Sequence, residues 1–128
     1  MKTKKLYLVF IILAVCGLLV ACGAKPEETG KQFLQAIKDE DFEAAFKLCS
    51  PDLQAELGDA TDLAFYFPTD VLQLDRWTST VTPDATDSAV STMAGDVTFT
   101  DGTEGTYSLT LKQIDKQYRV DNFAFEPK

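Results

Sequence analysis

The sequence predicts an α+β domain in which N-terminal helices pack on a curved antiparallel sheet of about four strands. Between residues 27 and 57, apolar residues recur every three to four positions, which is the period of an amphipathic helix. After Val71 the period changes to two and β-branched residues become frequent, as in strands. Because helices come first and consecutive strands with short turns follow, we expect an antiparallel sheet with the helices on its concave face.

The first two helices are marked by apolar stripes. Residues 27–38 carry acids in the first turn and place Phe33 on the same face as Ile37. Asp41 then offers a carboxylate to the free N–H groups that begin a second helix. The apolar positions of this second helix have the spacing i, i+3, i+4, i+7 and are Phe42, Ala45, Phe46 and Cys49.

A third helix is predicted between a start signal and a stop signal. Ser50 is a good N-cap, Pro51 suits the first turn, and Gly58 ends the helix. Residues 59–70 then lose the helical period around an aromatic cluster. This segment fits either a further turn of helix or a lid over a site.

Four strands are expected after the aromatic cluster, separated by short turns that are rich in Asp, Gly and Pro. They are residues 72–82, 89–100, 105–114 and 117–125. Gly95 interrupts the apolar face of the second strand, and the apolar phase of the last strand changes between Val120 and Phe123. Both irregularities predict β-bulges.

The N-terminus has the pattern of an export signal. Residues 1–5 contain three lysines, and residues 6–24 carry no charge and have a dense apolar centre. An uncleaved membrane anchor is the alternative, because a run of this length just spans a hydrocarbon core of about 30 Å. The end of the run, however, has small residues and a cysteine, which suit a cleavage region.

This end of the run resembles the lipobox of bacterial lipoproteins. The residues that carry the resemblance are Leu19, Val20, Ala21 and Cys22. It implies cleavage before Cys22, with diacylglycerol on the thiol and further acyl chains such as palmitate. We therefore expect a signal peptide at residues 1–21, a lipidated tether at 22–26 and one domain at 27–128, held on the extracytoplasmic face of the cell membrane.

The net charge limits the classes of binding partner to be expected, and the cysteine content limits the disulfides. Removing Lys2, Lys4 and Lys5 from the 12 basic residues leaves 9 against 20 acidic residues, a net charge of −11. This charge disfavours nucleic acid and anionic membrane surfaces as partners. With Cys16 cleaved off and Cys22 lipidated, Cys49 has no partner for an intrachain disulfide, and we expect it to be a buried thiol.

Two segments of the domain resemble the nuclear transport factor 2-like, or cystatin-like, superfamily. Residues 33–45, FLQAIKDEDFEAA, are similar to its two-helix opening, and residues 118–123, YRVDNF, to its last strand. The resemblance implies helices on a curved sheet. Because this superfamily includes enzymes, binding modules and dimerisation units, it makes a dimer conceivable and does not select an activity.

The residues offer little for catalysis. The chain has no histidine, which removes the commonest general base and most zinc sites, and we expect no metal or cofactor. Superfamily members that resemble ketosteroid isomerase pair a carboxylate base with a tyrosine. Here Asp121 is the one acid that the pattern places loosely toward the concave face, so we do not expect an enzyme.

The best indication of a site is a set of aromatic residues, although aromatic side chains also fill ordinary cores. The candidate pocket comprises Phe65, Tyr66, Phe67 and Trp77. We therefore predict a membrane-tethered binding or interaction module whose envelope partner is not identified, with a binder of a small apolar ligand as the alternative. A ligand binder requires an internal cavity lined by Trp77, an interaction module requires an exposed apolar face, and an enzyme requires a carboxylate and a tyrosine that converge.

Overall fold

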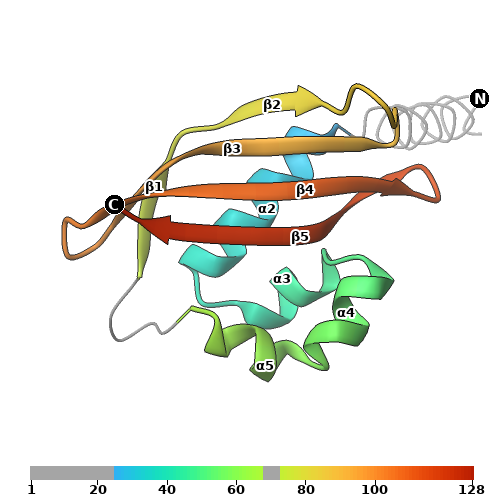
Figure 1. Ribbon diagram of the computed structural model, residues 1–128. Helices are drawn as coiled ribbons and strands as arrows, with labels where there is room; N and C mark the ends of the chain where they lie inside the picture. Colours follow the sequence, from blue (N-terminus) through green and yellow to red (C-terminus); the bar gives the residue numbers. More distant parts are fainter. Residues whose placement is uncertain (1–24, 68–72) are drawn as a thin grey trace, which may run out of the picture.

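The computed structural model describes residues 25–67 and 73–128 (Figure 1). The predicted signal peptide, the cleavage motif and the lipidation site Cys22 lie outside these residues. Helix α2 begins at Pro26, so the last residue of the predicted tether belongs to the domain.

Four helices precede the sheet in the described part of the chain, and three of them correspond to the predicted helices, although α3 ends before Cys49, which was predicted to belong to it. They are α2 (Pro26–Lys38), α3 (Phe42–Lys47), α4 (Pro51–Leu57) and α5 (Ala60–Phe65). The Asp41 carboxylate accepts the N–H of Ala44, and the Ser50 hydroxyl accepts that of Leu53, as N-caps do. Helix α5 lies within residues 59–70, the segment whose sequence fits either a further turn of helix or a lid.

The sheet is antiparallel and open, and it has five strands rather than about four. They are β1 (Leu74–Trp77), β2 (Thr80–Pro83), β3 (Val90–Phe99), β4 (Glu104–Ile114) and β5 (Gln117–Pro127). The order is β1-β3-β4-β5, and β2 also pairs with β3. The sequence predicts one strand at residues 72–82, but from Leu74 on there are two, because the ladder is interrupted at Thr78 and Ser79, where the Thr78 carbonyl accepts a hydrogen bond from the Tyr107 hydroxyl at 2.7 Å.

One predicted bulge is confirmed and the other is wrong. The β4–β5 register shifts where Thr110 and Leu111 face Asn122 and Val120, which leaves Asp121 as the extra residue. The β3–β4 register, in contrast, continues without a shift through Gly95. Gly95 is required for another reason: a Cβ at this position would overlap the carbonyl of Thr78.

The core lies between α2 and the concave face of the sheet (Figure 1). Alternate residues of β3 and β4, including Met93, Val97 and Leu109, are buried against the helices. Gly30 of α2 lies against Met93, so closely that a Cβ there would overlap the Met93 sulfur. The side chains that face each other across this layer are therefore tightly packed.

The junction between α3 and α4 is attached to the sheet by backbone hydrogen bonds. The N–H of Val120 donates to the carbonyl of Leu48, and the N–H of Ser50 donates to the carbonyl of Val120, both at 2.8 Å. Cys49 thus forms a short parallel bridge with β5. This bridge fixes how the helices α3–α5 sit beside the last strand.

Cys49 is buried, as predicted, with only 2% of its surface exposed, although α3 ends at Lys47, before it. Its thiol donates to the carbonyl of Ala45 at 3.4 Å, and burial raises its pKa from the ordinary 9.0 to about 12. The thiolate is the reactive form of cysteine. Both the access of reagents and the thiolate fraction are therefore low in the folded domain.

We expect Cys49 to react with a maleimide at least about a hundredfold more slowly in the native chain than in the denatured chain at pH 8, since its thiolate is scarce and shielded. The rate would be measured in a chain whose Cys16 and Cys22 have been replaced by serine. Denaturant returns the thiol to water and lowers its pKa toward 9.0. Equal rates in the two states would contradict the buried position.

Candidate interaction site

An aromatic cluster joins the end of α5 to the concave side of β5. The ring of Phe67 packs edge-on against that of Phe125, with the two ring centroids 5.0 Å apart. It also contacts the ring of Phe123 in a tilted arrangement, with a centroid distance of 5.5 Å. Tyr66 also meets Phe123 edge-on, at 5.6 Å. Such geometries are the favoured ones for aromatic pairs. The bulge at Asp121 makes the cluster possible, because it places Val120, Phe123 and Phe125 on one face of β5.

A small apolar cleft opens beside this cluster. Its volume is about 80 Å³, and it is lined by Ile37, Tyr66, Phe67, Leu74, Phe99, Phe125 and Pro127. Pockets that enclose a drug-sized ligand usually measure about 300–1,000 Å³. The cleft therefore has room for a group the size of one side chain and not for a whole ligand of that size.

The four aromatic residues singled out from the sequence do not form one pocket. Phe67 is buried and lines the cleft with Tyr66, which is 62% exposed. Phe65 is 77% exposed and is not among the residues that line the cleft. Trp77 is half-buried on β1, opposite Val97, and does not line this cleft. Phe123 and Phe125 complete the cluster and were not predicted as site residues. The phase change in the last strand was the sequence feature that indicated which face they occupy.

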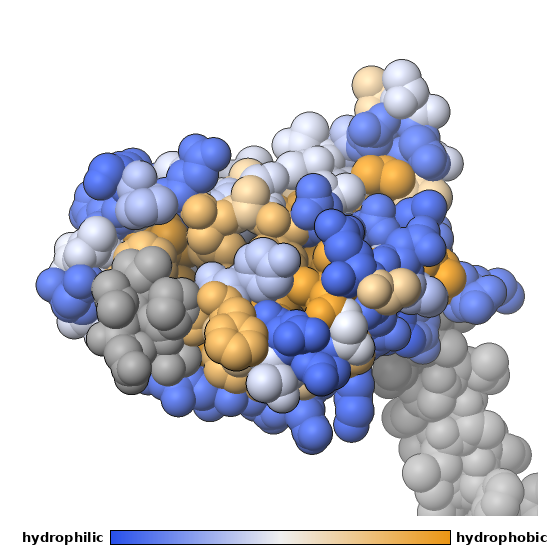
Figure 2. All heavy atoms as spheres, turned by 60° about the horizontal axis from the view of Figure 1, so that its bottom comes forward, coloured by the Kyte–Doolittle hydropathy of each residue, from blue (hydrophilic) through white to orange (hydrophobic). Residues whose placement is uncertain are grey.

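Helices α3–α5 present apolar side chains among hydrophilic ones on one face of the molecule (Figure 2). A shallow hollow of about 350 Å³ on this face is lined by three acidic residues and four others, which are Glu40, Asp41 and Glu43 together with Phe42, Ala60, Thr61 and Ala64. The exposed aromatic residues Phe65 and Tyr66 directly follow Ala64 in the chain. The neighbourhood of these two aromatic residues is therefore acidic.

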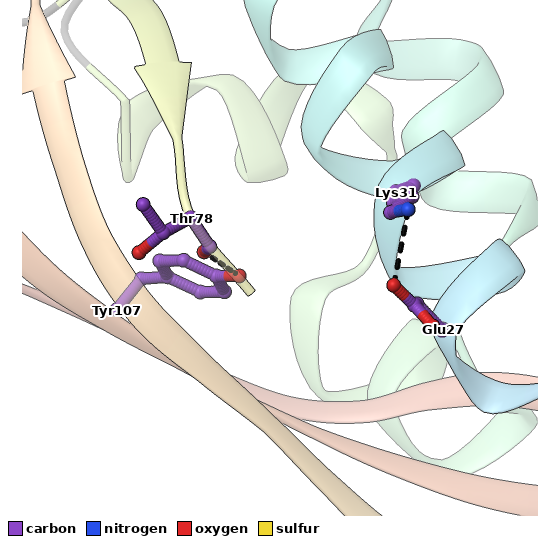
Figure 3. Close-up of polar contacts among 4 residues, drawn as sticks. All are labelled: Glu27, Lys31, Thr78 and Tyr107. Carbon is purple, nitrogen blue, oxygen red and sulfur yellow. Dashed lines mark hydrogen bonds and ion pairs between the residues drawn. The ribbon is translucent and has the colours of Figure 1, made fainter. Parts of the chain in front are cut away.

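The polar groups near the concave face are engaged in structural contacts. The Tyr107 hydroxyl donates to the carbonyl of Thr78, and burial, followed by the charge of Glu27, raises the Tyr107 pKa to about 12 (Figure 3). Glu27 itself pairs with Lys31 at 3.0 Å. Asp121 accepts a hydrogen bond from the Ser50 hydroxyl at 2.7 Å. The residues that line the apolar cleft include no carboxylate, so a tyrosine and an acid do not converge there.

Residues 25–67 and 73–128 contain no group of three or more His, Cys, Asp or Glu residues placed to hold a metal ion. Across the same residues, every helix is too short or too polar to cross a bilayer.

Comparison with known proteins identifies the fold. No protein-family profile and no curated protein sequence matches the chain. Among solved structures, it is similar to an NTF-2 like protein of unknown function from Shewanella oneidensis MR-1, with a TM-score of 0.55 and 16% sequence identity. The match covers 77% of this chain and 93% of that one. The chain therefore has an NTF2-like α+β fold, as the sequence predicted.

Proposed function

We propose that the chain is a lipid-tethered interaction module of the cell envelope, which binds a partner protein through Phe65, Tyr66 and the cleft beside them. The tether rests on the sequence Leu19-Val20-Ala21-Cys22. The binding surface rests on one structural observation: two consecutive aromatic side chains, Phe65 and Tyr66, are 77% and 62% exposed, and the second of them lines an apolar cleft. An exposed apolar group beside a cleft is typical of a protein-binding surface.

The size of the cleft favours a protein over a small apolar ligand. At about 80 Å³ it suits one inserted aliphatic or aromatic side chain, with Tyr66 in its wall and the exposed Phe65 as the preceding residue. Binding energy at interfaces is concentrated in such buried anchors and in tyrosine, tryptophan and arginine side chains at the centre, while the contacts around them exclude water. The small volume is the argument against a ligand enclosed at this position.

The acidic neighbourhood defines the chemistry of the partner. Glu40, Asp41 and Glu43 line the hollow next to Ala64, and Asp62 is exposed on α5. Charges at the rim of an interface mainly steer the encounter and select the partner. We therefore infer a partner segment that carries an apolar anchor side chain with lysine or arginine nearby.

The proposal is tested by a photo-crosslinking amino acid placed at position 65 or 66 in cells. We expect a discrete crosslinked protein from these positions and none from Thr82, an exposed position on β2. Tyr66→Ser should weaken capture of that protein about tenfold or more, because Tyr66 lines the cleft and truncating a hot-spot tyrosine costs about 2 kcal/mol or more at an interface. The free energy of unfolding should fall by no more than about 0.5–1.5 kcal/mol, which is the contribution of the edge-on pair of Tyr66 with Phe123, since the side chain is otherwise largely exposed.

The controls separate binding from folding. Phe67→Ser should destabilise the domain, because this ring is buried between β5 and the helices. If positions 65, 66 and 82 all crosslink to the same mixture, the interaction module is wrong. A small apolar molecule that co-purifies with the native chain and is lost from Tyr66→Ser would favour the ligand binder instead.

A further inference from the structure

A second hollow lies where the end of α3 and the start of α4 meet the β4–β5 turn. Its volume is about 380 Å³, which is within the range of small-ligand sites. The residues that line it include Lys47, Gln54, Asp115, Gln117 and Arg119, so it is polar where the aromatic cleft is apolar. None of these residues takes part in the interaction surface proposed above.

Arg119 is held in place there by neutral acceptors. One terminal nitrogen of its guanidinium donates to the carbonyl of Lys47 at 2.7 Å, and the other donates to the side-chain oxygen of Gln117 at 3.0 Å. A guanidinium has five N–H donors in a rigid plane, and these two bonds use only part of them. Arg119 is therefore oriented in advance while it retains donors for a further acceptor.

The charge of Arg119 is not balanced by an ion pair within the described residues. In these segments the ion pairs are Lys31 with Glu27 and Lys128 with Asp96. Lys47 lines the same hollow as Arg119, and Asp115 is the one carboxylate among the lining residues. The hollow thus has more basic than acidic side chains, although the chain as a whole has 20 acidic and 12 basic residues.

A third cation adjoins the hollow. Lys112 of β4 is directly opposite Arg119 of β5 in the antiparallel ladder. Side chains of directly opposed residues lie within contact distance on one face, and like charges at such positions destabilise the sheet. An anion bound between Lys112 and Arg119 would replace this repulsion by its attraction to both side chains.

We propose that this hollow binds a small oxyanion, that is, a phosphate or carboxylate group. Arg119 supplies a planar fork that matches two oxygens of such a group, and Lys47 supplies a second positive charge. The buried Cys49 also lines the hollow, and because its raised pKa keeps the thiol neutral, it adds no negative charge there.

The oxyanion has two possible sources, a free small molecule or the phosphate of a lipid headgroup. The hydroxyl of Thr29 in the first turn of α2 donates to the carbonyl of Tyr118 at 3.2 Å. The described chain therefore enters the domain next to the start of β5, at the same end as the hollow. If the proposed lipid on Cys22 is present, this end of the domain is close to the membrane, which makes a headgroup a reasonable source.

The test is a titration of the full chain, in micelles of an uncharged detergent, followed by NMR. Sodium phosphate is added at constant ionic strength, with sodium chloride as the reference. We expect saturable shifts of the Arg119 side chain and the Gln117 side-chain amide. Arg119→Lys keeps the charge but loses the fork, and it should weaken phosphate binding about tenfold or more.

Lys47→Gln is the second variant, because Lys47 is exposed and its backbone carbonyl, which holds Arg119, is retained. It should also weaken binding, whereas Lys31→Gln, with the same change of charge on α2, should not. Micelles doped with phosphatidylglycerol, without free phosphate, identify a headgroup as the source if the same signals shift. The proposal is overturned if neither addition gives saturable shifts, or if both variants bind like the native chain.

Discussion

A chain that ends at Lys116 is expected to lose cooperative unfolding altogether. Strand β5 pairs with β4 along its length, from Gly105 opposite Pro127 to Ile114 opposite Gln117. Val120 is fully buried, and its backbone also holds the α3–α4 junction. Removing β5 therefore takes away both the edge of the sheet and the attachment of three helices.

The size of the loss can be compared with the stability of a domain. A fully buried large side chain contributes about 1.5–3 kcal/mol, and a whole domain is stable by about 5–15 kcal/mol. Tyr118, Phe123 and Phe125 are half-buried, so each contributes toward the lower limit, and Val120 contributes fully. Together with the lost ladder, these four side chains account for most of the stability.

Chemical denaturation followed by the fluorescence of Trp77 would measure this effect. The matched control removes residues 1–24 instead, because the core side chains described above all lie between Lys25 and Lys128. We expect the control to keep a single sharp transition close to that of the full chain. A sharp transition in the chain that ends at Lys116 would mean that β5 is dispensable, which is incompatible with the structure.

The helices could be predicted because their determinants are local. The caps Asp41 and Ser50 bond to N–H groups three residues ahead, and Gly58 takes the positive φ of 93° that ends α4. Each of these signals is complete within a few residues of sequence. The antiparallel sheet could be predicted for the same reason, because the alternation of apolar and polar residues and the short turns are also local features of the sequence.

The break between β1 and β2 could not be predicted, because its cause lies elsewhere in the chain. The Thr78 carbonyl is taken up by Tyr107, which is 29 residues further on. Gly95 permits the close approach of Thr78, and this contact, too, depends on the sheet already being assembled. A glycine within a strand was therefore interpreted as a bulge, which is the commoner local reason for it.

The candidate site was predicted only in part for a similar reason. Three consecutive aromatic residues show neither the helical period nor the strand alternation. The sequence pattern therefore does not predict that Phe67 is buried while Phe65 is exposed. The other half of the cluster comes from β5, where a single bulged residue decides which face Phe123 and Phe125 occupy. The cationic hollow at Arg119 is formed by two stretches, residues 47–54 and 114–119, that meet only in the folded chain.

Replacing Cys22 by alanine is expected to abolish lipid labelling completely. Lipidation joins diacylglycerol to the cysteine thiol, and alanine offers no atom to which it can be joined. The resemblance of residues 19–22 to a lipobox also implies that cleavage follows lipidation. The variant should therefore remain an uncut precursor that is larger than the mature chain by the 21 residues of the signal peptide.

The readouts should be metabolic labelling with a tagged palmitate and the size of the chain, since fractionation would not distinguish the two states. The uncut precursor keeps the uncharged run of residues 6–24 and with it an affinity for the membrane. A lipidated mature chain is expected to be held instead by acyl chains, of which two or more are needed for a stable anchor. Cys49→Ala is the matched control, because it removes a thiol that is buried in the folded domain and should leave labelling and cleavage unchanged. Labelling that persists in Cys22→Ala, or that disappears in Cys49→Ala, would show that Cys22 is not the lipidated residue.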